Sequence, residues 1–299
     1  MLEEIREFID NVRRLVDRRL DEVLPAETDP PEVLSKAMRY SVFAGGKRLR
    51  PCLVVASAVA CSDMDPADPS DTVLDGAAAV EMVHTYSLIH DDLPCMDDDD
   101  MRRGRPTNHK VFGEANALLA GDALLTHAFA VLAREKDRAP GRLRAVRVLA
   151  EMSGPGGMVG GQVADLEGEM IEPTEEKLLF IHRNKTAKLM TASILVGAYL
   201  VGAEKAQVES LQRIGDSTGL AFQNVDDILD VVGNEKEMGK PVGSDSRRRK
   251  LTSVSVYGLD GAEREADRRL LDAKKELALF GERGRILEEL AEFVVNRRS

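Results

Sequence analysis

Six aspartates fall within ten consecutive positions, 91–100, in the stretch "HDDLPCMDDDDMRRGR". Carboxylates this close repel one another at neutral pH. Asp91 and Asp92 also end an apolar helical pattern, where the helix dipole disfavours an anion. Pro94 cannot continue that helix, so Asp97 is expected to come round on a turn. Two unfavourable electrostatic effects at one place predict a bound cation that offsets both.

A second aspartate cluster lies far along the chain in "FQNVDDILDVVG" (222–233). Asp226 and Asp230 are four residues apart and share one face of a helix, with Asp227 beside them. Apolar residues surround all three, so the carboxylates should lie at the edge of a buried wall. Sets of carboxylate oxygens favour Mg²⁺, which commonly bridges carboxylates to the phosphates of a substrate. The glycine and glutamate spacing of an EF-hand is absent.

Basic segments accompany these aspartates at "GGKRLRP" (45–51), "MRRGR" (101–105) and "SRRRK" (246–250). A phosphate group bridged to Mg²⁺ needs fixed cations beside it. The cations placed next to glycine pairs, aspartate clusters or polar loops are Lys47, Arg50, Arg102, Arg103, Lys185, Lys240 and Lys250. Taken singly, each is an ordinary surface charge. As a set with the two aspartate clusters they predict a diphosphate site.

Helical periodicity runs through nearly the whole chain, beginning with Leu2, Ile5, Ile9, Val12 and Val16 on one helix face. Further apolar segments are expected at 52–61, 73–93, 114–134, 142–152, 157–170, 175–203, 204–232, 260–280 and 284–297. Short breakers separate them, and neither a strand pattern nor a long linker nor a repeat stands out. We therefore expect one all-α domain over residues 1–299, a bundle of roughly ten or more helices.

The composition narrows the classes of partner. The 299 residues carry a net charge of −11, which argues against nucleic acid. The N-terminal segment lacks an apolar signal-peptide run, and the apolar run 189–203 is too short to span a bilayer, so a buried core helix is expected there. Cys52, Cys61 and Cys95 are odd in number and lack CxxC spacing, as reduced thiols would be. We expect a cytoplasmic protein with no membrane span.

The ordered segments "FAGGKRLRP", "HTYSLIHDDLPCMDDDDMRRG", "GDALL", "GGQVADL", "NKTAKL" and "FQNVDDILDV" resemble the motifs of the trans-isoprenyl diphosphate synthases. The similarity extends over residues 43–252 and is greatest to the bacterial short-chain farnesyl and geranylgeranyl diphosphate synthases. It implies an isoprenoid synthase fold with a central substrate cavity and a homodimer. It also implies a Mg²⁺-dependent prenyltransferase that condenses isopentenyl diphosphate head to tail with dimethylallyl or geranyl diphosphate.

The resemblance also implies roles for individual residues. Several Mg²⁺ ions on the allylic diphosphate would be held by Asp91, Asp92, Asp97, Asp226, Asp227 and Asp230. Isopentenyl diphosphate would be bound by Lys47, Arg50, His84 and Arg103, and the allylic diphosphate by Arg102, Lys185, Lys240 and Lys250. Thr186 and Gln223 would lie near the developing carbocation, and Gln223 would also touch substrate. The residues expected to act in catalysis are then Asp91, Asp92, Lys185, Thr186, Gln223 and Asp226. Asp98, Asp99 and Asp100 receive no role.

Product length is expected to depend on Tyr86, with Ser87 beside it. Tyr86 lies five residues before Asp91, about 7.5 Å along a helix axis at the usual rise per residue. A ring at that depth would close the end of a cavity that opens at the metal site. In the family, an aromatic residue here implies mainly a C15 product, farnesyl diphosphate. The alternative is a geranylgeranyl diphosphate synthase with a C20 product.

Two further alternatives have weaker support in the sequence. A class I terpene cyclase also ionises allylic diphosphates, but cyclases guide carbocations with aromatic walls, and this chain has no Trp and only four Tyr. A non-catalytic partner subunit would have no reason to keep two sets of mutually repelling aspartates. The prenyltransferase prediction needs no protein nucleophile, and no Ser/His/Asp or Cys/His set is evident.

Overall fold

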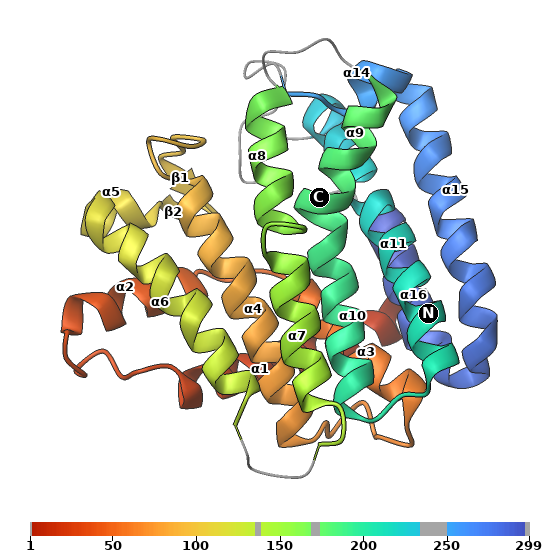
Figure 1. Cartoon of the computed structure of the whole chain (residues 1–299), viewed down its shortest axis with the longest axis horizontal. Coiled ribbons are helices and arrows are strands. Elements are labelled where there is room, and N and C mark those ends of the chain that lie inside the picture. The colour runs from red at the N-terminus through yellow and green to blue at the C-terminus, as the bar shows by residue number, and fades with distance from the viewer. Residues whose placement is uncertain (1, 135–138, 169–173, 234–249, 297–299) are drawn as a thin grey trace.

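The computed structural model describes residues 2–134, 139–168, 174–233 and 250–296. Within them the chain is a helical bundle, so the all-α prediction is confirmed (Figure 1). In chain order the α-helices are α1 (Leu2–Val23), α2 (Glu32–Val42), α3 (Leu49–Cys61), α4 (Asp71–Asp91), α5 (Asn108–Phe112), α6 (Glu114–Leu132), α7 (Arg142–Ser153), α8 (Met158–Gly168), α9 (Glu175–Ile181), α10 (Lys188–Leu200), α11 (Lys205–Val232), α14 (Ser253–Tyr257), α15 (Leu259–Leu277) and α16 (Arg285–Asn296). A π-helical segment, His182–Ala187, joins α9 to α10, and a 3₁₀ segment, Ala278–Gly284, joins α15 to α16.

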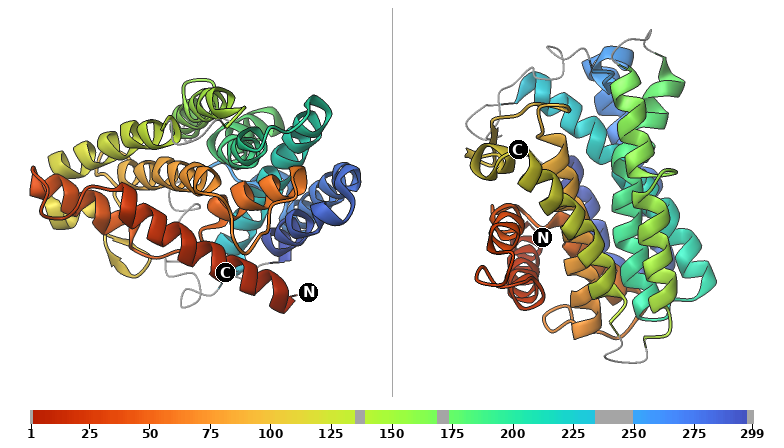
Figure 2. Two further views of the ribbon diagram at one scale, coloured as in Figure 1. Left: turned by 90° about the horizontal axis from the view of Figure 1, so that it is seen from below. Right: turned by 60° about the vertical axis from the view of Figure 1, so that its left-hand side comes forward.

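One large cluster of buried apolar side chains draws on helices from α1, with Ile5, to α16, with Val294. Helices α3 and α10 lie at its centre and pack against each other, as Figure 1 shows. Their backbones approach so closely that a Cβ at Gly197 would lie 2.0 Å from the carbonyl oxygen of Val54. Helix α10 is buried along nearly its whole length, which confirms the predicted core helix. Figure 2 shows α1 lying along one side of the bundle, where it contacts α3 and α4.

Helix α4 carries the first aspartates to the end of the bundle where the site forms. Its N-cap is Ser70, whose side chain accepts a hydrogen bond from the amide of Val73. It ends at Asp91, and the amide of Asp97 donates back to the carbonyl of Asp91 at 2.8 Å. The turn predicted from Pro94 is therefore present, and it brings Asp97 back beside Asp91.

A short ribbon follows that turn, with β1 (Met101–Arg102) antiparallel to β2 (Arg105–Pro106). Its connection, Arg103–Gly104, has positive φ at both residues, 52° and 73°, as a tight hairpin turn requires. The sequence predicts no strand here, because two residues per strand are too few to produce an alternating pattern. The ribbon holds the basic segment "MRRGR" over the end of α4.

Helix α6 is the one helix in the described ranges that is long and apolar enough, by length and composition, to cross a membrane. It packs along α4, where a Cβ at Gly121 would lie 2.1 Å from the His90 ring. One face buries Ala117 and Leu124 in the core. The other leaves Leu118 and Leu119 46% and 54% exposed. The helix is therefore an outer wall of the bundle with an uncovered apolar face.

The π-helical segment His182–Ala187 lies within the stretch that the sequence predicts as one helix, 175–203. Two glycines let neighbouring helices reach its backbone. A Cβ at Gly161 of α8 would lie 2.1 Å from the amide nitrogen of Lys185, and a Cβ at Gly219 of α11 would lie 2.4 Å from Cα of Ala187. Such π turns often occur at functional sites. This one carries Lys185 and Thr186.

Gly161→Ala is expected to lower the free energy of unfolding by about 1–3 kcal/mol. The added methyl would meet the backbone amide of Lys185, which cannot move aside as a flexible side chain can. Urea unfolding followed by circular dichroism measures the change. Gly156→Ala is the matched control, since a Cβ at Gly156 has no neighbour within 4 Å. Equal stability of the two variants would contradict the close contact.

Candidate active site

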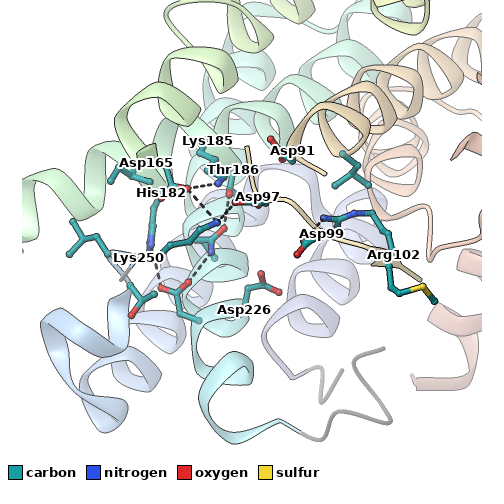
Figure 3. Close-up of a pocket in the computed structure, with 17 residues that line it drawn as sticks. Asp91, Asp97, Asp99, Arg102, Asp165, His182, Lys185, Thr186, Asp226 and Lys250 are labelled. Atoms are coloured by element: carbon teal, nitrogen blue, oxygen red, sulfur yellow. Dashed lines mark hydrogen bonds and ion pairs between the residues drawn. The ribbon is translucent and has the colours of Figure 1, made fainter. Parts of the chain in front are cut away.

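The two aspartate clusters meet around one polar pocket of about 220 Å³. Asp91 and Asp97 reach it from the end of α4, and Asp226 and Asp227 from α11. Figure 3 shows Asp91, Asp97 and Asp226 around this pocket, with Lys185 and Lys250 reaching into it. The further lining residues are Leu88, Asp99, Met101, Arg102, Asp165, Ile181, His182, Lys185, Thr186, Gln223, Lys250, Leu251 and Thr252.

The environment of Asp91 disfavours its charge. Burial raises the pKa of its carboxyl, and the nearby Asp97 raises it further, while Lys185, Arg102 and Lys250 act in the opposite direction. The sum of these effects places the pKa of Asp91 above its usual value. A divalent cation bound between Asp91 and Asp97 would reverse this balance, because it favours the ionised form of both carboxyls.

Three neighbouring residues hold the carboxylate of Asp227 in place. Its Oδ1 accepts a hydrogen bond from Nε2 of Gln223 at 2.9 Å, and its Oδ2 accepts one from the amide of Ser253 at 2.6 Å and lies 3.3 Å from Nε2 of His182. Burial opposes the charge, but His182 and these hydrogen bonds outweigh it and hold the pKa of Asp227 below its usual value. Asp230 is buried on the same helix and does not line the pocket.

Asp92, next to Asp91, points elsewhere. Its carboxylate accepts a hydrogen bond from Nε of Arg102 at 2.7 Å, and the residue as a whole is 3% exposed. Burial raises the pKa of Asp92 to about 6, and Arg102 offsets only part of that effect. Asp92 lines a smaller pocket together with Arg103. The structure thus brings Asp91, Asp97, Asp226 and Asp227 to the polar pocket, and leaves Asp92 and Asp230 outside its lining.

Two lysines project into the same polar pocket. Nζ of Lys185 donates to Oδ2 of Asp165 at 2.5 Å. Nζ of Lys250 lies 3.0 Å from Oδ1 of Asp97 and 3.8 Å from Oδ2 of Asp165 (Figure 3). Asp165, 7% exposed on α8, has no role predicted from the sequence. Its available signal is its place in the motif segment "GGQVADL". Lys240 lies outside the described residues.

Thr186 and Gln223 join the two sides of the pocket. Oγ1 of Thr186 donates to Oε1 of Gln223 at 2.6 Å, and the amide of Gln223 in turn donates to Asp227. The chain of hydrogen bonds therefore runs from the π segment to α11. It fixes the amide of Gln223 at the junction between the polar pocket and a second, apolar cavity, both of which Gln223 and Thr186 line.

The apolar cavity, of about 480 Å³, adjoins the polar pocket. Asp91 and Asp226 line both, so the carboxylates stand where the two spaces meet. The side chains lining only the apolar cavity are Arg50, His84, Tyr86, Ser87, His90, Leu93, Cys95, Met96, Leu118, Met158, Val159, Gln162, Val163, Leu166 and Phe222. Tyr86 is 5% exposed and packs edge-on against the His90 ring, 5.6 Å between centroids.

A basic cluster lies at the side of this cavity. Nη1 of Arg50 is 3.2 Å from Nε2 of His84. Burial, followed by the charges of Arg50 and Arg103, lowers the pKa of His84 well below its usual value, so the ring is neutral at pH 7. Arg103 donates to the carbonyl of Gly45, and Nζ of Lys47 lies 5.7 Å from the centre of the Phe293 ring. The loop between α2 and α3, residues 43–48, carries Lys47. Around it gather Arg50, His84 and Arg103.

The three aspartates left without a role divide between two environments. Asp99 lines the polar pocket and lies 3.5 Å from Nη2 of Arg102. Asp98 and Asp100 lie away from it, in a group with His109 whose potential metal-ligand atoms are within 4.8 Å of one another. Asp100 is already paired with Lys110 at 2.6 Å. Of these three, Asp99 alone lies within reach of the pocket.

Comparison with known proteins gives one family. The polyprenyl synthetase family model matches residues 31–280. Farnesyl diphosphate synthase of Bacillus subtilis is 43% identical over 302 residues, 99% of each chain. A farnesyl/geranylfarnesyl (FPP/GFPP) synthase structure from Zymomonas mobilis superposes with a TM-score of 0.86 at 37% identity, covering 99% of this chain and 100% of that one. A geranyltransferase of Helicobacter pylori, complexed with magnesium and isoprenyl diphosphate, gives 0.81 at 32% identity, covering 97% and 96%.

The chain therefore belongs to the polyprenyl synthetase family. The resemblance drawn from the motifs is confirmed, and so is the isoprenoid synthase type of all-α fold. The individual residue roles stay predictions, which the geometry of the pocket now makes specific.

Proposed function

We propose that this protein is a Mg²⁺-dependent prenyltransferase that condenses isopentenyl diphosphate with an allylic diphosphate, mainly to farnesyl diphosphate. One observation carries the proposal. Carboxylates from α4 and α11 and two lysines surround a polar pocket that opens into an apolar cavity. A diphosphate needs the polar pocket, and a hydrocarbon chain needs the cavity. The similarity to farnesyl diphosphate synthase of Bacillus subtilis over nearly the whole chain supports the same activity.

The donor set of the pocket fits Mg²⁺. Asp91, Asp97 and Asp226 offer only carboxylate oxygens, and magnesium sites in proteins combine one or two carboxylates with substrate phosphates and water. These three would hold the metal, whereas Asp227 already satisfies Gln223, His182 and Ser253. Bound Mg²⁺ would supply positive charge to the diphosphate as it leaves. The magnesium in the complex of the Helicobacter pylori geranyltransferase supports the choice of ion.

The protein's own cations complete the diphosphate site. Lys185 and Lys250 are paired with Asp165 and Asp97 across the pocket, and Arg102 is paired with Asp92 beside it. A diphosphate entering the pocket would take over hydrogen bonds from these lysines. As the carbon–oxygen bond breaks, negative charge grows on the leaving diphosphate, and fixed cations stabilise it there. The protein thus favours the transition state over the bound substrate.

The apolar cavity and the basic cluster serve the carbon chain and the second substrate. Leu93, Met96, Phe222 and their neighbours exclude water, which would otherwise capture the allylic cation. Arg50, His84, Arg103 and Lys47 would bind isopentenyl diphosphate beside that cation. The double bond of isopentenyl diphosphate forms the new carbon–carbon bond, and the proton that is then lost passes to the departed diphosphate. No side chain has to act as a nucleophile.

Incubation with Mg²⁺, isopentenyl diphosphate and a C5, C10 or C15 allylic diphosphate tests the proposed function. We expect C15 product from C5 and C10 primers, and loss of turnover when EDTA removes the metal. A predominant C20 product would assign the chain to the geranylgeranyl type. Cyclic hydrocarbons would point to a terpene cyclase. No product from any primer would overturn the proposed activity, and turnover in EDTA would overturn the role of Mg²⁺.

We also propose that the protein is a cytosolic homodimer. Leu118 and Leu119 of α6 are exposed, and so are Val159 and Val163 of α8, at 44% and 51%. Leu118, Val159 and Val163 line the apolar cavity, so a second copy packed on this face would cover its open side. The free state of Cys52, Cys61 and Cys95 suits a reducing cytosol. Light scattering after size exclusion, giving the monomer mass at micromolar concentration, would contradict the dimer.

A further inference from the structure

Arg48 lies between Lys47 and Arg50 but has no place in the chemistry proposed above. Its side chain is almost fully buried and makes three hydrogen bonds to three different helices. Nε donates to Asp17 of α1 at 2.8 Å, and Nη1 donates to Glu81 of α4 at 2.6 Å. Nη2 donates to the carbonyl of Val42, the last residue of α2, at 2.6 Å. A buried charge persists only with such complete pairing, so this one ties the loop to the bundle.

The backbone of Arg48 is also constrained. Its φ of 51° and ψ of 38° place it in the left-handed region, immediately before α3 begins. A residue with a side chain adopts this conformation at a free-energy cost, and it persists where surrounding contacts impose it. The three hydrogen bonds of the guanidinium are such contacts. They fix the direction in which the chain leaves Lys47 and enters the first turn of α3, where Arg50 stands.

Helix α4 makes the link to the second-substrate site. Glu81 and His84 are three residues apart and so occupy neighbouring positions on one helix face. Glu81 binds Arg48, and Nε2 of His84 lies 3.2 Å from Nη1 of Arg50. Two adjacent contacts therefore hold this part of the chain on α4: that of Arg48 with Glu81 and, from the first turn of α3, that of Arg50 with His84.

The other side of the loop is held by the β1–β2 ribbon. The guanidinium of Arg103 packs against Gly46, where a Cβ would lie 2.8 Å from its carbon atom. Arg103 also donates to the carbonyl of Gly45. The position of the loop relative to both Arg103 and His84 thus depends on Arg48, which anchors it from the interior.

We propose that Arg48, through its ion pair with Glu81, is a positioning residue for the isopentenyl diphosphate subsite. It sets the geometry of Lys47 and Arg50 against His84 and Arg103 without touching the substrate. The inference rests on the proposed function and adds to it a residue of the interior. Its consequence is selective: disturbing Arg48 should weaken the isopentenyl subsite and spare the allylic one, whose aspartates and lysines have other supports.

Arg48→Met and Glu81→Gln test this role. We expect the KM for isopentenyl diphosphate to rise about tenfold or more, because small displacements of binding groups have large effects. The KM for the allylic diphosphate, kcat at saturation and product length should stay near those of the wild type. Calorimetric titration of the metal-loaded protein with isopentenyl diphosphate alone should show the same loss of affinity. Arg48→Lys keeps the charge and should restore part of it.

Arg19→Met is the matched control. Like Arg48, Arg19 is a buried arginine, but it lies on α1 and is 5% exposed. Its Nε donates to Asp75 of α4 at 2.8 Å, and its Nη1 donates to Glu22 at 2.8 Å. It joins α1 to α4 as the Arg48 network does, but does not contact the loop. Its loss should lower the melting temperature and leave both KM values unchanged.

The outcomes separate the two proposals. Wild-type turnover combined with an unchanged isopentenyl KM in Glu81→Gln and Arg48→Met would overturn the role of Arg48 alone. An equal rise of both KM values, or the same rise in Arg19→Met, would show a merely structural residue. Absence of product from the wild type would overturn the proposed function, and this inference with it. If Arg48→Met does not fold, Glu81→Gln and Arg48→Lys give the same discrimination.

Discussion

Asp91→Asn is expected to lower kcat by about a thousandfold, or about 4 kcal/mol of transition-state stabilisation. Asparagine keeps the shape of the side chain but cannot carry the negative charge that a metal ligand needs. Asp91 stands where the polar pocket meets the apolar cavity, beside Asp97 and Lys185. Steady-state kinetics measured over a range of Mg²⁺ concentrations should show both the lower kcat and a need for more metal.

Asp98→Asn is the matched control, because it removes one charge from the same aspartate run. Asp98 is exposed and does not line the polar pocket. Its replacement should leave kcat and the Mg²⁺ requirement close to those of the wild type. A loss equal to that of Asp91→Asn would mean that the net charge of the loop matters and not a particular ligand. Full activity of Asp91→Asn would remove Asp91 from the metal site.

The helical architecture could be predicted from the sequence, because the periodicity of apolar residues is a local property of each segment. The segments expected at 114–134 and 204–232 correspond to α6, Glu114–Leu132, and α11, Lys205–Val232. The turn after Asp91 was equally readable, since proline restricts the residue before it. The π segment was not, because it depends on close approach by Gly161 and Gly219 from helices elsewhere in the chain.

The meeting of the two aspartate clusters was also predicted, but not which carboxylate faces the pocket. Neighbouring residues on a helix point in directions about 100° apart. The sequence cannot tell which of two adjacent aspartates turns inward. The pairing with Arg102 keeps Asp92 out of the polar pocket, whereas His182 and Ser253 bind Asp227, which still lines it. These partners come from separate segments, so packing had to be known first.

The role of Asp165 could not be predicted from composition and residue spacing. A single carboxylate on a helix has no pattern, and its meaning here comes from the two lysines that meet it in space. Arg48 is the opposite case, a cation inside a recognised motif that turns away from the site. In "GGKRLRP" the sequence predicts ligand roles for Lys47 and Arg50 and assigns none to Arg48. In the structure Arg50 lines the apolar cavity, whereas the buried Arg48 holds the loop between α2 and α3.

Tyr86→Ala is expected to shift the products from C15 toward C20 or longer. The ring lines the apolar cavity, is 5% exposed and packs edge-on against His90 of the next helical turn. It stands about 7.5 Å along α4 from Asp91, at the usual helical rise. Removing it opens space beyond the point that a growing chain reaches. Reverse-phase separation of the dephosphorylated products gives the chain length directly.

Two companion variants show whether the ring's volume is what limits the chain. Tyr86→Phe keeps the ring and should keep the C15 product, although it loses a hydroxyl whose pKa burial raises to about 12. Ser87→Phe adds a ring at the neighbouring lining position and should shorten the product. Both avoid the cavity that alanine leaves, which costs about 3–5 kcal/mol of stability for an aromatic residue in a core. Unchanged chain length in a folded Tyr86→Ala, together with no shortening in Ser87→Phe, would show that this part of α4 does not end the cavity.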